Sequence, residues 1–155
     1  MLTPWRGAEV AQLDRGQVVE LYAMRRVLEG TAAGLAAEHA SDAEIDHLFD
    51  LLKQDRAARG NPGRQLEINR AFHQALYAAA HNRYLLKALN ALADSLALLK
   101  STTYEVRGRA AAALGEHGII AEAIRNRGAE DAERVTRAHI ESAERARIEL
   151  LFGDP

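Results

Sequence analysis

Three of the six histidines in this chain have a spacing that suits metal binding. His117 lies 11 residues before Gly128, and His139 lies 11 residues after it. If Gly128 marks the tip of a helical hairpin, both imidazoles lie about 16 Å from the turn at roughly 1.5 Å per residue. Gly118, beside His117, leaves room for the two helices to pack closely. The spacing therefore predicts two imidazoles at one height on neighbouring helices.

A third helix can add two more ligands at that height. Asn69 and His73 are four residues apart, so they project from one face of a helix. The flanking Phe72 and Leu76 indicate that this face is turned inward. Imidazole nitrogens suit zinc, nickel, copper or iron. Three imidazoles and one oxygen ligand leave positions open for water or an anion, as in metal sites that are not purely structural.

The alternative for each histidine taken singly is an ordinary surface position or a hydrogen-bonded position in the core. A histidine near the C-terminus of a helix, for example, is favoured by the partial negative charge there. Only three of the six histidines have the spacing described above. We assign no function to the other three, which are His39, His47 and His81.

The apolar residues recur with a helical period along most of the chain. Ser41 and Glu44 form a capping-box signature, Asn61 precedes a proline as an N-cap, and Gly128 is expected to end a helix at the C′ position. No alternation with period two competes with these patterns. The chain is therefore expected to be an all-α, antiparallel bundle of about six helices. The expected helices cover, approximately, residues 17–39, 42–59, 62–80, 83–100, 109–126 and 129–151, with a polar loop at 101–108.

The composition bounds the class of protein. A chain of 155 residues has room for one domain with a real core, and 48% hydrophobic but only 5% aromatic residues imply a core of small and aliphatic side chains. The net charge of −2 does not indicate a nucleic-acid-binding surface, and the lack of cysteine excludes disulfides and thiolate metal sites. Without an apolar run of about 20 residues or a leader sequence, we expect a soluble cytoplasmic protein with no membrane contact.

Three segments resemble the signature stretches of a known family. They are LYAMRRVLEGTAAGLAA, NRAFHQALYAAAHNRYL and EHGIIAEAIRNRGAEDAERVTRAHI, in this order. Together they resemble the FCD domain, the C-terminal ligand-binding domain of the FadR-like branch of GntR transcription regulators. The resemblance extends over about residues 17–150 and implies an antiparallel helical bundle. It also implies that residues 1–16 are a remnant of an interdomain linker, that residues 17–152 are the FCD domain, and that the DNA-binding winged helix-turn-helix is absent from this chain.

The resemblance also implies a metal site and its ligands. Many members of the family bind a divalent metal through an Asp or Asn, the histidine four residues later, and two more distant histidines. These positions are Asn69, His73, His117 and His139 here, the set that the spacing also predicts. The metal is expected to be zinc, with nickel as the alternative. Because an amide oxygen is an uncharged and weaker ligand than the carboxylate common at position 69, we expect weaker metal retention and a stronger attraction for an anionic effector.

A small carboxylate effector is expected beside this metal. Arg25 lies inside the apolar stripe of the first helix, where an unpaired charge is costly. It can form a structural ion pair with Glu29, four residues on, or it can reach the bundle interior and bind a carboxylate in a bidentate manner. Asn82 and Tyr104 are further candidates for the effector pocket, although helix capping is the favoured role of Asn82.

The expected function is effector sensing. Binding of the acid would shift a homodimer between two arrangements and so alter DNA binding by the full-length regulator. This chain alone is not expected to bind operator DNA specifically.

Two other classes remain open. A metal-dependent hydrolase would need a general base near the metal, but Glu67 and Glu116 are expected to point away from it, and HExxH and nucleophile-elbow motifs are absent from the sequence. A metal-free oligomerisation bundle is the third reading. Metal analysis of the purified protein would separate the metal-free bundle from the other two classes.

Overall fold

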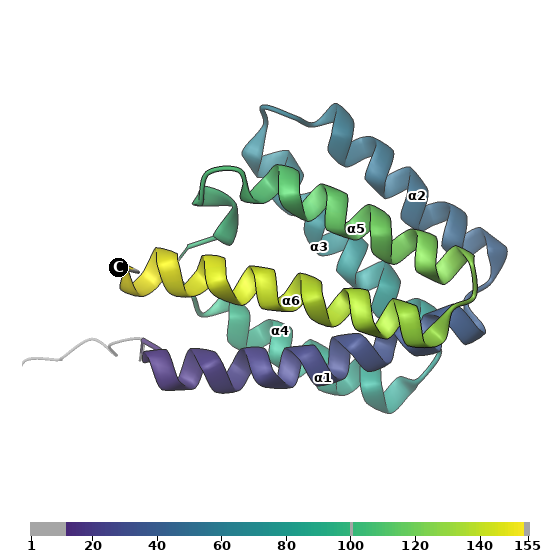
Figure 1. The fold of residues 1–155 in the computed structure, drawn as a ribbon, viewed down its shortest axis with the longest axis horizontal. Helices are drawn as coiled ribbons and strands as arrows, with labels where there is room; N and C mark the ends of the chain where they lie inside the picture. The colour runs from purple at the N-terminus through teal and green to yellow at the C-terminus, as the bar shows by residue number, and fades with distance from the viewer. Residues whose placement is uncertain (1–11, 100, 154–155) are drawn as a thin grey trace, which may run out of the picture.

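The computed structural model of this chain describes residues 12–99 and 101–153. These residues form six α-helices and one short 3-10 helix, and they form no strand (Figure 1). The expected all-α fold is therefore confirmed. The helices are α1 (Arg15–His39), α2 (Asp42–Ala57), α3 (Pro62–Ala79), α4 (Arg83–Ala97), η1 (Thr103–Glu105), α5 (Arg109–Arg125) and α6 (Ala129–Phe152).

Side-chain caps fix where several helices begin. Ser41 and Glu44 form the predicted capping box of α2, because the Ser41 hydroxyl accepts from the Glu44 N–H at 3.1 Å and the Glu44 carboxylate accepts from the Ser41 N–H at 2.8 Å. Asn61 caps α3 as predicted. A further capping box joins Asp14 to Gln17, so α1 begins two residues earlier than the sequence pattern indicates. Residues 1–11 of the predicted arm lie outside the described residues.

Helix α1 is the central helix of the bundle. It lies side by side with α6 along most of its length, and it also contacts α3, α4 and α5 (Figure 1). Helix α5 packs against α6, and α2 packs against α3 and α5. A glycine permits the close approach of α1 and α6, because a Cβ at Gly30 would lie 2.9 Å from the Cγ of Arg137. Side chains of α1 can therefore reach every helix that carries a predicted metal ligand.

The core is made mostly of alanine and branched aliphatic residues, as the composition predicts. A large cluster joins α1, α2, α3 and α5, with Leu48, Phe72 and Ile120 fully buried within it. A smaller cluster lies between α1 and α6 around Tyr22 and Ile140. Because the core has few aromatic residues and many alanines, these helices pack closely. The polar side chains in the interior are therefore surrounded by closely packed apolar groups.

The hairpin between α5 and α6 is present, but its turn differs from the prediction by one residue. The left-handed position is Arg127, with φ 59°, whereas Gly128 has φ −87° and caps α6. The Arg127 N–H donates to the Ile124 carbonyl at 3.0 Å and the Gly128 N–H donates to the Ala123 carbonyl at 3.1 Å, which is a Schellman motif. The Arg127 side chain donates to the Ala40 carbonyl at 2.6 Å, and this bond favours an arginine at a position that usually selects glycine.

Two smaller differences concern the connection between α4 and α5. Helix α4 ends at Ala97, earlier than predicted, and Lys100 lies outside the described residues. The segment predicted as a plain loop contains η1, which is capped by the Thr102 hydroxyl. None of the described helices has the length and apolar character needed to cross a bilayer.

Candidate metal centre

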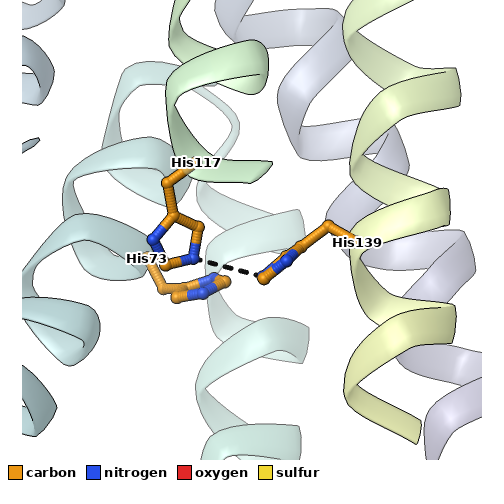
Figure 2. A group of neighbouring side chains, drawn as sticks. All are labelled: His73, His117 and His139. Atoms are coloured by element: carbon orange, nitrogen blue, oxygen red, sulfur yellow. Dashed lines mark hydrogen bonds between the residues drawn. The ribbon is translucent and has the colours of Figure 1, made fainter. Parts of the chain in front are cut away.

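His73, His117 and His139 converge from α3, α5 and α6 in the interior of the bundle (Figure 2). One ring nitrogen of each lies within 4.8 Å of the others, and the Nε2 atoms of His117 and His139 are 3.2 Å apart. Two imidazole nitrogens that bind one zinc at about 2.0–2.1 Å with a tetrahedral angle lie roughly 3.3 Å apart. The His117–His139 pair thus already has the separation of two ligands to one ion.

Carboxylates fix the orientation of two of these rings. The His139 Nδ1 lies 2.8 Å from Glu116 Oε1, and the His73 Nδ1 lies 3.1 Å from Glu29 Oε1. An ionised carboxylate only accepts hydrogen bonds, so each Nδ1 carries the proton and donates it. The Nε2 lone pair of each ring is then free for a metal. Histidine ligands in metalloproteins commonly donate their other ring N–H to a carboxylate in this way.

Burial keeps two of the imidazoles neutral. Burial lowers the pKa of His117 well below its usual range, and the neighbouring His139 and His73 lower it further. Burial also lowers the pKa of His139 to about 4, although the hydrogen bond to Glu116 opposes that shift. The His117 ring stacks on Phe72 with centroids 4.5 Å apart. Neutral imidazole is the form that binds metal, so these rings are ready to bind near pH 7.

Glu29 is a buried carboxylate at the centre of a polar network. Burial raises its pKa, but the charge of Arg25 and the hydrogen bond from His73 outweigh that effect and hold the pKa well below its usual range. The Arg25 Nε donates to Glu29 Oε2 at 2.7 Å, and the Tyr77 hydroxyl donates to Glu29 Oε1. The structural ion pair that the sequence offered for Arg25 is therefore present. The same ion pair anchors the carboxylate that orients His73.

Glu116 orients His139 in the same way that Glu29 orients His73. Arg109 donates to both of its oxygens, at 2.8 and 2.9 Å. Burial raises the pKa of Glu116, but the hydrogen bonds from His139 and Arg109 outweigh it and bring the pKa to about 2. The sequence predicts that Glu116 points away from the metal, but its carboxylate lies against His139 on the adjacent helix. The position of Glu116 directly before a histidine was the signal available in the sequence.

A cavity of about 480 Å³ adjoins the histidines. His73 and His139 lie on its wall, as do Asn69, Arg25 and Tyr104 from the predicted set. Asn69 lies one helical turn before His73 on α3. The predicted fourth ligand and two of the three predicted effector residues therefore share one cavity with two of the histidines.

The remaining predicted positions lie elsewhere. Asn82 is exposed and does not line the cavity; its side chain accepts from the backbone N–H groups of Tyr84 at 3.2 Å and Leu85 at 3.0 Å, which caps α4. His81, at the end of α3, pairs with Glu44 at 2.8 Å on the surface.

Comparison with known proteins gives the family. The family profile of the FCD domain matches residues 20–142, so this chain belongs to the FCD domain family. The family that the three sequence segments indicate is thereby confirmed.

Two curated relatives are similar over most of the chain. The "Nta operon transcriptional regulator" of Aminobacter aminovorans is 26% identical over 142 residues, which is 91% of this chain and 66% of that protein. The "Uncharacterized HTH-type transcriptional regulator YdhC" of Bacillus subtilis (strain 168) is 29% identical over 136 residues, which is 86% of this chain and 61% of that protein. The chain thus spans slightly under two thirds of the length of these relatives.

Two solved structures share the fold. E. coli McbR/YncC superposes with a TM-score of 0.78 at 19% identity, over 90% of this chain and 68% of that chain. Streptococcus agalactiae GntR superposes with a TM-score of 0.70 at 24% identity, over 83% of this chain and 58% of that chain. At these identities, the similarity establishes the helical architecture only.

Proposed function

We propose that this chain is the effector-sensing domain of a GntR-type transcription regulator and that it binds a divalent metal. His73, His117 and His139 would hold the ion, with Asn69 as a fourth ligand, and zinc fits this donor set best, with nickel as the alternative. The observation that carries the proposal is the convergence of three imidazoles, two of them oriented by carboxylates, beside a cavity. The names of the two curated relatives support the regulatory role.

The proposed effector is a small organic carboxylate. The cavity volume of about 480 Å³ lies in the range of small-molecule sites. A metal held by neutral ligands keeps its full positive charge, and Arg25 on the same wall adds a guanidinium. The acid would take an open position on the metal, and Arg25 would hold it in place.

The proposal assigns DNA binding to a winged helix-turn-helix domain of the full-length regulator. Effector binding would change the population of two arrangements of a homodimer and so change the spacing of two such domains. The Bacillus subtilis relative is named as an HTH-type regulator, which supports this division of roles.

Helix α4 offers the surface for the proposed homodimer. Tyr84 and Leu98, at its two ends, are 80% and 59% exposed. Two copies of α4 that pack antiparallel about Ala91 would place Tyr84 of one copy against Leu98 of the other. The same arrangement sets Lys87 beside Asp94 of the second copy, so the helix is complementary to itself in charge as a two-fold interface requires.

Two alternative classes are less well supported. A hydrolase needs a free general base beside the metal. Glu116 and Glu29, the carboxylates nearest to the histidines, already accept hydrogen bonds from histidines and arginines. A metal-free oligomerisation bundle does not explain why three imidazoles are buried together, since neutral imidazoles alone fill a core less well than apolar side chains.

The test is a zinc titration of purified, chelator-treated protein, followed by calorimetry. We expect one zinc per chain, and we expect His117→Ala to lower the affinity at least tenfold. His47→Ala, which removes an exposed histidine on α2, is the matched control and should bind zinc normally. Failure to bind zinc or nickel would reject the metal site.

The effector is tested by a thermal-shift screen of small carboxylates, with and without zinc. Stabilisation that appears only with zinc would support the sensor. Turnover of esters or phosphoesters by the zinc-loaded protein would favour the hydrolase instead.

A further inference from the structure

Arg147, on α6, is a buried arginine to which the described residues offer no carboxylate within ion-pair distance. It is 7% exposed. Its Nε donates to the Tyr22 hydroxyl at 3.3 Å and its Nη1 donates to the Ser101 carbonyl at 2.5 Å, and both acceptors are neutral. Arg25 and Arg109, on the same cavity, are each paired with a glutamate. A buried cation is costly without a counter-charge, so Arg147 favours binding of an anion that the described residues do not supply.

Helix α6 places Arg147 and His139 on one wall of the cavity. His139, Ala143 and Arg147 follow each other at intervals of four residues, and all three line the cavity. Eight residues of α-helix rise about 12 Å, so the imidazole and the guanidinium serve different parts of the same space. The cavity therefore has the candidate metal centre in one part and a separate positive charge in another.

Two residues of the cavity wall also contain a buried polar atom that lacks a hydrogen-bond partner among the described residues. These atoms are the Tyr104 hydroxyl and the Nε of Arg109. Tyr104 belongs to the same connection as Ser101, whose carbonyl accepts from Arg147. Buried polar groups are rarely left unpaired, so this part of the wall has hydrogen-bonding capacity that the described residues do not use.

The charge on the wall as a whole favours anions. The cavity is lined by four arginines, of which Arg70 is the exposed one, and by a single aspartate, Asp94, which is also exposed. Two of these arginines, Arg25 and Arg109, form ion pairs with Glu29 and Glu116, which do not line the cavity. Among the described residues, Arg147 is thus the buried guanidinium on this wall whose charge no carboxylate balances.

We infer that Arg147 forms a second anion subsite, and that the effector is a small acid with two anionic groups, in its simplest form a dicarboxylate. This inference rests on the proposed function. One carboxylate would bind at the metal and Arg25. The second would accept hydrogen bonds from the Arg147 guanidinium, a charge-assisted arrangement that arginine forms well.

The experiment compares each diacid with its own half-ester on zinc-loaded protein. Succinate, glutarate and adipate are titrated by calorimetry beside their monomethyl esters, which keep the chain and remove one charge. We expect at least one diacid to bind roughly tenfold more tightly than its monoester, as a charge-assisted hydrogen bond allows. Arg147→Gln should bring the two affinities together while leaving zinc and monoester binding unchanged. Arg145→Gln, an exposed position on the same helix, should keep the preference.

A second variant keeps the test decisive if Arg147→Gln fails to fold. Arg147→Met keeps a side chain of similar length and removes the buried charge, so it should leave the Tm close to that of the parent and still abolish the preference for diacids. Equal binding of diacids and monoesters, no binding of any diacid, or a preference that survives both variants would overturn the inference. A protein that binds zinc and monoesters without preferring diacids refutes only the second subsite, whereas a protein that binds no zinc refutes the proposed function.

Discussion

The carboxylates of Glu29 and Glu116 decide which nitrogen of two histidines faces the candidate metal centre. Each accepts a hydrogen bond from an Nδ1–H, and each is itself held by an arginine. A partner of this kind raises the basicity of the imidazole and fixes the angle of its ring. We therefore expect these two residues to contribute to metal affinity although neither contacts the ion.

Glu116→Gln tests that contribution. The amide can still accept from His139, but it is a weaker acceptor and it leaves Arg109 without its ion-pair partner. We expect zinc affinity to fall about 10- to 100-fold in a competition titration against a chelating dye. Glu122→Gln, an exposed position on the same helix, serves as the control and should bind zinc as the parent does. An unchanged affinity in the Glu116 variant would show that the carboxylate has only a structural role.

Asn69→Asp tests the choice of ligand at the fourth position. Asn69 lies on the cavity wall one turn before His73, and a carboxylate there would add a negative charge to a site of neutral imidazoles. We expect the aspartate variant to bind zinc more tightly and carboxylates more weakly, because the extra charge offsets part of the charge of the ion. Asn90→Asp adds the same charge at an exposed position of α4 and should change neither affinity. Tighter zinc binding by the parent than by Asn69→Asp would contradict this expectation.

At the scale of elements, the α4 surface gives a prediction about assembly. Lys87→Glu places like charges together across the proposed two-fold interface, so the dimer should weaken. The double change Lys87→Glu with Asp94→Lys restores opposite charges and should restore the dimer. Analytical ultracentrifugation over a concentration series measures both.

The control for this assembly prediction lies on another helix. Ile119, on α5, is an apolar residue that is 56% exposed and distant in sequence from α4. Ile119→Glu should leave the association unchanged. Dimers that are insensitive to Lys87→Glu, or that dissociate with Ile119→Glu, would place the interface elsewhere.

The relative positions of His117 and His139 on the α5–α6 hairpin could be predicted from the sequence. Equal offsets of His117 and His139 from Gly128 set their height on two antiparallel helices, and the 3.2 Å separation of their Nε2 atoms agrees with it. The turn residue was wrong by one position, because the long-range hydrogen bond from Arg127 to Ala40 favours an arginine where local rules favour glycine. The spacing of residues along one helix or one hairpin is local information. This information was enough to predict that His117 and His139 lie at the same height on neighbouring helices.

Contacts between distant helices could not be predicted in this way. Glu29 reaches His73 across 44 positions, and the Arg147 side chain reaches Tyr22 across 125. Such pairs depend on how each helix is rotated about its own axis, which periodicity gives only approximately. The carboxylates that orient the histidines are therefore visible only in the three-dimensional structure. The same holds for the buried Arg147, which has no carboxylate partner among the described residues.

For the whole molecule, the buried histidines predict an acid-sensitive fold in the metal-free state. Burial lowers the pKa of His139 to about 4 and lowers that of His117 well below its usual range. In the unfolded chain both imidazoles titrate near pH 6.5. As the pH falls below about 6.5, the unfolded state therefore binds protons that the folded state does not, and the free energy of unfolding decreases. For His139 alone the decrease down to pH 4 is on the order of 3 kcal/mol.

Chemical denaturation of chelator-treated protein at pH 7.5, 6.5, 5.5 and 4.5 measures this loss. We expect the free energy of unfolding to be nearly constant from pH 7.5 to 6.5 and to fall steadily below that. The variant His117→Gln with His139→Gln should show a clearly smaller slope, because its buried side chains do not titrate. Burial raises the pKa of Asp55, which works in the opposite sense, but this residue is present in both proteins and so cancels from the comparison. Equal slopes in the two proteins would mean that both histidines take up protons in the folded state at the same pH as in the unfolded chain, and that burial does not hold them neutral below pH 6.5.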